Sequence, residues 1–126
     1  MVILDPINGV RFGMCNGLDD FYREIDCTTI DIARRSIAGN VYDIYVDDEG
    51  LLKADCGEKV SAVRVEDGKI VPQLVGTLVF ANHDSEGYTT DLSLKDTLAI
   101  SSRIKPVSVV NTDTGKDAVN YCVFLD

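Results

Sequence analysis

VYDIYV (residues 41–46), DDEG (47–50) and LLKA (51–54) follow one another directly in this chain. The first segment predicts a β-strand, because aromatic and β-branched residues favour strands. The acidic segment predicts a turn, since carboxylates and glycine suit turn backbones. The third segment predicts the partner strand. We therefore expect an acidic β-hairpin over residues 41–54.

Residues 28–39, just before this hairpin, have the features of a short helix. Thr28 can cap the start of such a helix, and Asp31 suits its positive N-terminal end. Gly39 is placed to end it. Three apolar residues would share one helical face: Ile30, Ala33 and Ile37. Residues 28–39 are therefore predicted to be the first helix.

Strands are expected in the N-terminal part of the chain. Asn8-Gly9 is a hairpin-type turn signal that can join residues 2–4 to residues 10–14. Residues 21–25 alternate apolar and polar side chains, which is typical of a half-buried strand.

Further strands are expected after the acidic hairpin. Residues 62–65 and 69–71 flank Asp67-Gly68 and predict another hairpin. Residues 74–81, rich in Val, Leu and Phe, predict a central strand. A polar loop is expected over residues 82–87.

A second helix is expected over residues 93–102, because Ser93 and Asp96 repeat the capping pattern. Leu94 and Leu98 would face inward. Two final strands, residues 107–110 and 119–124, follow.

These elements predict an α+β fold, with a mainly antiparallel sheet and two short helices packed on one face. The 126 residues suit a single domain over residues 1–126. Residues 105–126 would form its C-terminal β-hairpin.

The composition restricts the partners. The chain has 21 acidic and 12 basic residues, a net charge of −9. This balance argues against direct binding to nucleic acid or to an anionic membrane, since both need a basic surface. The chain start lacks the basic and long apolar regions of a secretion signal, so a cytoplasmic location is expected.

The middle of the chain, residues 25–104, resembles the domain-of-unknown-function 3846 family of phages and mobile elements. The resemblance lies in the order of four features: a Thr-led helix ending in glycine (28–39), an acidic turn before a Leu-Lys strand (48–53), a Val-Gly-Thr strand (75–80) and a Ser-Leu-led helix (93–102). The family often has an Asn-containing loop after the Leu-Lys strand, where this chain has residues 56–59, Cys-Gly-Glu-Lys. The resemblance implies a phage or mobile-element origin and no specific activity.

No catalytic set, metal site or cofactor site is predicted. The four cysteines, at positions 15, 27, 56 and 122, lack the close pairs of zinc and redox sites and are expected to be free, with Cys122 in the core. The single histidine, His83, is expected to be a solvated loop residue. Glycines show no phosphate-binding spacing.

An acidic cluster is the remaining candidate interaction surface. Its members are Asp43, Asp47, Asp48, Glu49, Asp55 and Glu58. They are interpreted either as a solvated face or as a carboxylate row that binds a basic groove of another protein. The favoured hypothesis is therefore a non-enzymatic accessory protein that binds another protein.

The alternative hypothesis is a small enzyme or ligand-binding domain with a site near Cys56 and His83. A homodimer through an exposed edge strand, residues 107–110 or 119–124, is a further hypothesis.

Overall fold

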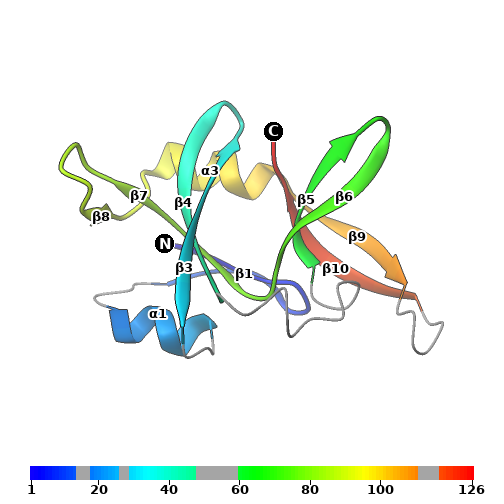
Figure 1. Cartoon of the computed structure of the whole chain (residues 1–126), viewed down its shortest axis with the longest axis horizontal. Coiled ribbons are helices and arrows are strands. Elements are labelled where there is room, and N and C mark those ends of the chain that lie inside the picture. The colour runs from blue at the N-terminus through cyan, green and yellow to red at the C-terminus, as the bar shows by residue number, and fades with distance from the viewer. Residues whose placement is uncertain (14–17, 26–28, 48–59, 111–116) are drawn as a thin grey trace.

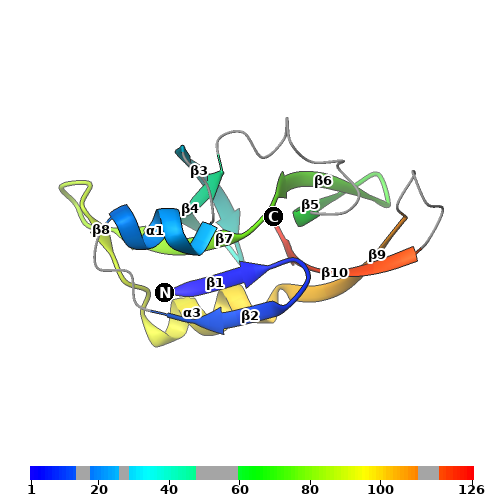
Figure 2. The same ribbon diagram turned by 90° about the horizontal axis from the view of Figure 1, so that it is seen from below.

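The computed structural model contains two sheets that lie side by side, with one helix above and one below the first sheet (Figures 1 and 2). It describes residues 1–13, 18–25, 29–47, 60–110 and 117–126. This part of the chain is mainly antiparallel sheet with few helices. None of its helices is long and apolar enough to cross a membrane.

The first sheet is built from antiparallel pairs only. Its strands are β1 (Val2–Asp5), β2 (Gly9–Phe12), β3 (Ile30–Ile37), β4 (Asn40–Asp47), β7 (Leu78–His83) and β8 (Thr89–Thr90). Their order is β2-β1-β7-β4-β3, and β8 pairs with the end of β7. The predicted N-terminal hairpin and the strand over residues 41–46 are confirmed. The predicted hairpin partner, residues 51–54, lies outside the described residues, and β4 pairs instead with β3 and β7.

The second sheet contains the two remaining hairpins. Its strands are β5 (Val60–Glu66), β6 (Lys69–Val75), β9 (Ile104–Val110) and β10 (Asp117–Phe124), in the order β6-β5-β10-β9. The predicted hairpin around Asp67-Gly68 and the pairing of the last two strands are confirmed. β5 and β10 pair in parallel. The buried Cys122 lies in the core of this sheet, as expected.

The chain passes from the second sheet to the first at Gly76. The prediction of one strand over residues 74–81 is wrong, because β6 ends at Val75 and β7 begins at Leu78. Gly76 has a φ of 80°, which glycine adopts without steric cost and which redirects the chain. The second half of the predicted strand, β7, is central in its sheet, as expected.

The strand predicted over residues 21–25 is instead a helix, α1 (Leu18–Ile25). Phe21 and Ile25 are both buried. Residues four apart share a face in a helix and also in a strand, so their spacing did not separate the two structures. The Phe21 ring stacks on Tyr45 with 4.2 Å between ring centroids, and this contact fixes the helix on the sheet.

The helix predicted over residues 28–39 is also wrong, because this segment contains the eight-residue strand β3. β3 pairs with all of β4, from Ile30 opposite Asp47 to Ile37 opposite Asn40. The connecting residues Ala38 and Gly39 both have positive φ, of 51° and 86°. Two such residues form the tight turn that suits a two-residue hairpin. The Thr-led helix that contributed to the family resemblance is therefore absent from the described residues 29–39.

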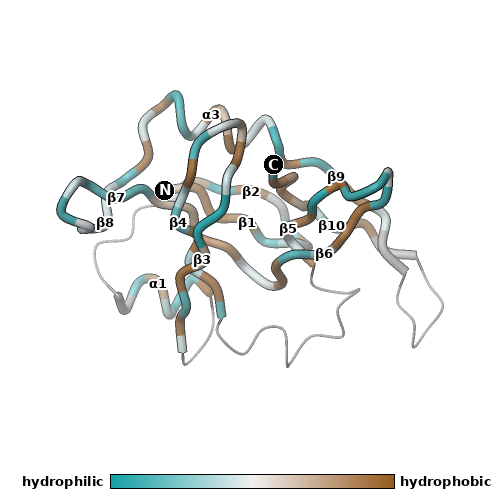
Figure 3. The backbone as a smooth tube through the Cα atoms, turned by 45° about the horizontal axis from the view of Figure 1, so that its top comes forward, coloured by the Kyte–Doolittle hydropathy of each residue, from teal (hydrophilic) through white to brown (hydrophobic). Residues whose placement is uncertain are grey.

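The two helices of the described residues pack on opposite faces of the first sheet, not on one face as predicted. Alternate side chains of β1 and β7 point to opposite faces. Ile3 and Val79 pack with Phe21 of α1. On the other face, Val2 and Leu78 pack with the second helix, α3 (Leu94–Ser102). Figure 3 shows mainly hydrophobic colour along β1, which is covered on both faces.

The start of α3 is capped as the sequence predicts. Ser93 is the N-cap, and its hydroxyl accepts a hydrogen bond from the Asp96 amide. The inward-facing residues were predicted wrongly, because Leu94 and Leu98 are 76% and 61% exposed and Ile100 is buried. The buried Tyr42 of β4 also anchors the helix, since its hydroxyl donates to Asp96 Oδ1 at 2.7 Å. Hydrogen bonds from Tyr42 and Ser93 hold the pKa of Asp96 below its usual value.

The Tyr42 anchor should make stability depend on alkaline pH. Burial, followed by the hydrogen bond to Asp96, raises the pKa of Tyr42 to about 12. The folded state therefore keeps this proton between about pH 10 and pH 12, where the unfolded state loses it. The stabilisation is complete below pH 10 and is lost as the pH rises toward 12. Urea unfolding should show wild type losing up to about 1.4 kcal/mol per pH unit more than Tyr42→Phe in this range. Equal pH slopes for the two proteins would contradict the assignment.

Candidate functional site

The predicted acidic cluster does not form one exposed row in the described structure. Asp43 is only 3% exposed, so it is not a surface carboxylate. Asp47 borders a pocket. The other four members lie outside the described residues: Asp48, Glu49, Asp55 and Glu58. Alternation along β4 explains the burial of Asp43, because this residue faces the α1 side between neighbours that face α3.

Asp43 links a histidine and an arginine. Its Oδ2 lies 3.0 Å from His83 Nδ1, and its Oδ1 accepts from Arg34 Nε at 3.1 Å. The expectation of a solvated loop histidine is therefore wrong, since His83 ends β7 and is half-buried against Asp43. An ionised carboxylate can only accept, so the contact favours a proton on Nδ1. Cys56, the other member of the predicted His83 site, lies outside the described residues.

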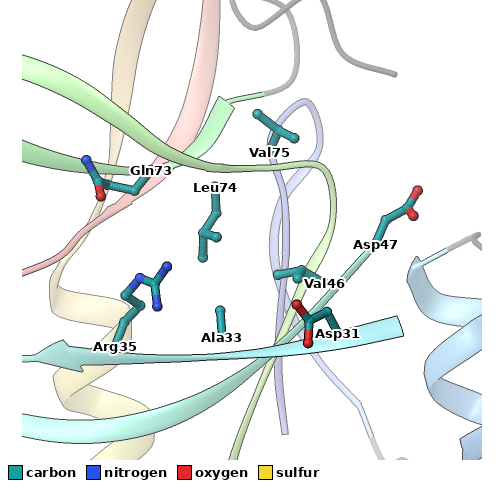
Figure 4. Close-up of a pocket in the computed structure, with 8 residues that line it drawn as sticks. All are labelled: Asp31, Ala33, Arg35, Val46, Asp47, Gln73, Leu74 and Val75. Atoms are coloured by element: carbon teal, nitrogen blue, oxygen red, sulfur yellow. The ribbon is translucent and has the colours of Figure 1, made fainter. Parts of the chain in front are cut away.

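A pocket lies on the α3 side of the first sheet, between β3 and β6. Its volume is about 180 Å³. It is lined by Asp31, Ala33, Arg35, Val46, Asp47, Gln73, Leu74 and Val75. Figure 4 shows the two carboxylates at one end, Arg35 and Gln73 at the other, and Ala33 and Leu74 between them. The pocket is therefore apolar in its centre, with opposite charges at its two ends.

The outer side of β3, next to this pocket, is covered by side chains. The two-residue turn makes Ile37 and Asn40 a hydrogen-bonded pair, so the backbone groups of Ser36, Arg34 and Ile32 point away from β4. Asp31 Oδ1 accepts from the Ile32 amide at 2.8 Å. Arg35 Nη1 donates to the Arg34 carbonyl at 2.9 Å. Charged side chains thus take hydrogen bonds that a neighbouring strand would make.

The end of the described chain makes one strand-like contact on the same side. The Asp126 amide donates to the Ser36 carbonyl at 3.0 Å. The Asp126 carboxylate accepts from the Ser36 hydroxyl and from the amides of Ala38 and Gly39. These hydrogen bonds, that of Ser36 first, lower the pKa of the Asp126 carboxyl. The contact shows that a backbone can dock on the outer side of β3.

The other edge strands of the described structure are less suited to accept a strand. β6 contains Pro72 and β9 contains Pro106, and proline lacks the amide proton that an added strand would bond. β2 is only four residues long. β3 has eight residues and no proline. It is therefore the longest edge in the described residues with its backbone donors complete.

The sequence reasoning missed Asp31, Arg35 and Gln73 as site residues. Reading residues 28–39 as a helix placed Asp31 at a helix start and gave Arg35 no role. The alternation of Asp31, Ala33 and Arg35, followed by Ala38-Gly39 as a turn, is the signal that fits the observed strand.

The chain was compared with known proteins at three levels. No family model, no curated protein and no solved structure matches it.

Proposed function

We propose that this protein binds another protein by accepting one of its extended segments as an added strand on the outer side of β3. The observation that carries the proposal is the side-chain covering of this edge by Asp31 and Arg35. Within the described residues, β3 pairs with only one strand, β4. Addition of a strand to an exposed sheet edge is a recurrent mode of peptide recognition.

Replacing the side-chain hydrogen bonds on this edge by those of an incoming strand changes the free energy only a little. An incoming carbonyl would replace Asp31 on the Ile32 amide, and an incoming amide would replace Arg35 on the Arg34 carbonyl. A hydrogen bond contributes only about 0.5–1.5 kcal/mol net. The side-chain contacts can therefore keep the edge from aggregating and still yield to a specific segment.

The wider proposal is a non-enzymatic accessory protein of a bacterial phage or mobile element, acting in the cytoplasm. It rests on the net charge of −9, which disfavours nucleic acid as the direct partner, and on the Ser93-led helix, the feature that the structure retains from the resemblance of residues 25–104.

A second candidate is a small enzyme or ligand-binding domain near Cys56 and His83. The contact of His83 with the buried Asp43 favours it, because a carboxylate can orient an imidazole as a base. The pocket lies on the opposite face of the sheet from this contact. We therefore propose strand addition at β3 as the principal function.

A pair of matched proline variants tests strand addition. Peptides selected from a random display library on the wild-type protein would be measured by fluorescence anisotropy. Ile32→Pro removes an outward amide from β3, and Ile70→Pro makes the same change on edge strand β6. The two isoleucines are matched in exposure, at 45% and 49%. We expect Ile32→Pro to weaken binding at least tenfold and Ile70→Pro to leave it unchanged.

Peptide N-methylation tests the same contact if Ile32→Pro fails to fold. Two forms of each peptide would carry methyl groups on alternate amides, one form on the odd positions and the other on the even positions. One form blocks the hydrogen bonds to β3, and the other leaves them intact. Strand addition would be overturned if the selected peptides bound Ile32→Pro as tightly as wild type. It would also be overturned if both methylated forms of a peptide bound wild type as tightly as the unmethylated peptide. Failure to select any peptide that binds would do the same.

A further inference from the structure

The charges of the pocket are arranged along β3 at alternate positions. Asp31, Ala33 and Arg35 share the face that looks into the pocket. Asp31 and Arg35 are four positions apart, so their Cα atoms are about 13 Å apart along the strand. Figure 4 shows Leu74 of β6 facing Ala33 between them.

The size of the pocket favours side chains of a longer segment over a whole small molecule. Its volume of about 180 Å³ lies below the roughly 300–1,000 Å³ of most small-molecule sites. An extended peptide reaches both charges with side chains at positions i and i+4.

The register of an added strand determines which peptide side chains meet these residues. Ile32 and Arg34 would form the hydrogen-bonded pairs with an antiparallel segment. Asp31, Ala33 and Arg35 would then lie in the non-hydrogen-bonded pairs, where opposing side chains are closest. Every pair of the first sheet is antiparallel, which favours this direction.

We infer, in an extension that rests on the proposed function, that the site selects an antiparallel segment of the pattern acidic-x-apolar-x-basic. The acidic side chain pairs with Arg35, the apolar side chain lies between Ala33 and Leu74, and the basic side chain pairs with Asp31. Asp47 adds negative charge at the basic end. The peptide backbone replaces the contacts that Asp31 and Arg35 make to β3, so both side chains become available for the peptide's charges.

Two synthetic peptides of the same composition test this charge pattern. One nine-residue peptide has the core Glu-Thr-Val-Thr-Lys, and the other has Lys-Thr-Val-Thr-Glu, with threonine at the flanking positions. We expect the first to bind wild type about tenfold more tightly, because the swap turns two cross-strand attractions into repulsions. The D31R/R35D double variant should invert this preference, and circular dichroism would verify that it folds.

The outcomes separate this inference from the proposed function. If the two peptides bind wild type equally and neither binds Ile32→Pro, the charge pattern is overturned and strand addition stays intact. Preference for the second peptide would overturn the antiparallel direction. Absence of binding by both peptides, together with failure of the display selection, would overturn both. The comparison on wild type decides the inference even if the double variant is unfolded.

Discussion

Replacing Phe80 with alanine should lower the free energy of unfolding by about 3–5 kcal/mol. Phe80 is fully buried in β7, the strand between β1 and β4, where it pairs with Val2 and Ile44. Both helices cover the sheet at this strand. The groups around the ring are therefore buried themselves, and exposed side chains cannot move in to fill the cavity that its removal leaves. A domain of this kind is stable by only about 5–15 kcal/mol, and the change is therefore a large part of the total.

Phe12 provides the matched control for Phe80. It lies on edge strand β2 and is 66% exposed. Phe12→Ala removes the same atoms and should change stability by about 0.5 kcal/mol or less, because little apolar surface returns to water. Urea unfolding of the two variants, followed by circular dichroism, measures the difference. Similar losses in both would show that β7 is not the centre of the core.

The second large effect is expected at Ile100 in α3. Ile100→Ala should cost about 2–5 kcal/mol, since this side chain is fully buried against the α3 face of the sheet. Leu98→Ala, two residues earlier, should cost less than about 0.5 kcal/mol because Leu98 is largely exposed. The sequence reasoning, which placed Leu98 inward, expects the reverse order. Unfolding midpoints of the two variants decide between these orientations of α3.

The candidate site could be predicted only in part. Asp47 was identified and borders the pocket, but Asp43 was grouped with it although its side chain is buried beside Arg34 and His83. The two carboxylates belong to the same face of β4 by alternation, but Asp43 lies where β4 pairs with β7, whereas Asp47 ends β4 beyond that pairing. The pocket joins β3 to β6, which is far away in the sequence. Neither segment alone indicates that the two lie together.

The sequence by itself determined the local features of this protein. Asp67-Gly68 makes its turn with positive φ at both residues, and Ser93 caps α3, because these conformations depend on a few neighbouring residues. Gly39 has the positive φ expected of it, although it belongs to a hairpin turn and not to a helix end.

Only the tertiary structure decided between helix and strand for residues 18–25 and 30–37. The apolar spacings in both segments fit either element, and the choice followed from burial: Phe21 stacks on Tyr45, and β3 gains a complete ladder with β4. The same long-range packing set the helices on opposite faces and left β3 at an edge of the sheet. The proposed site depends on the edge position of β3, and edge position depends on where distant strands pair.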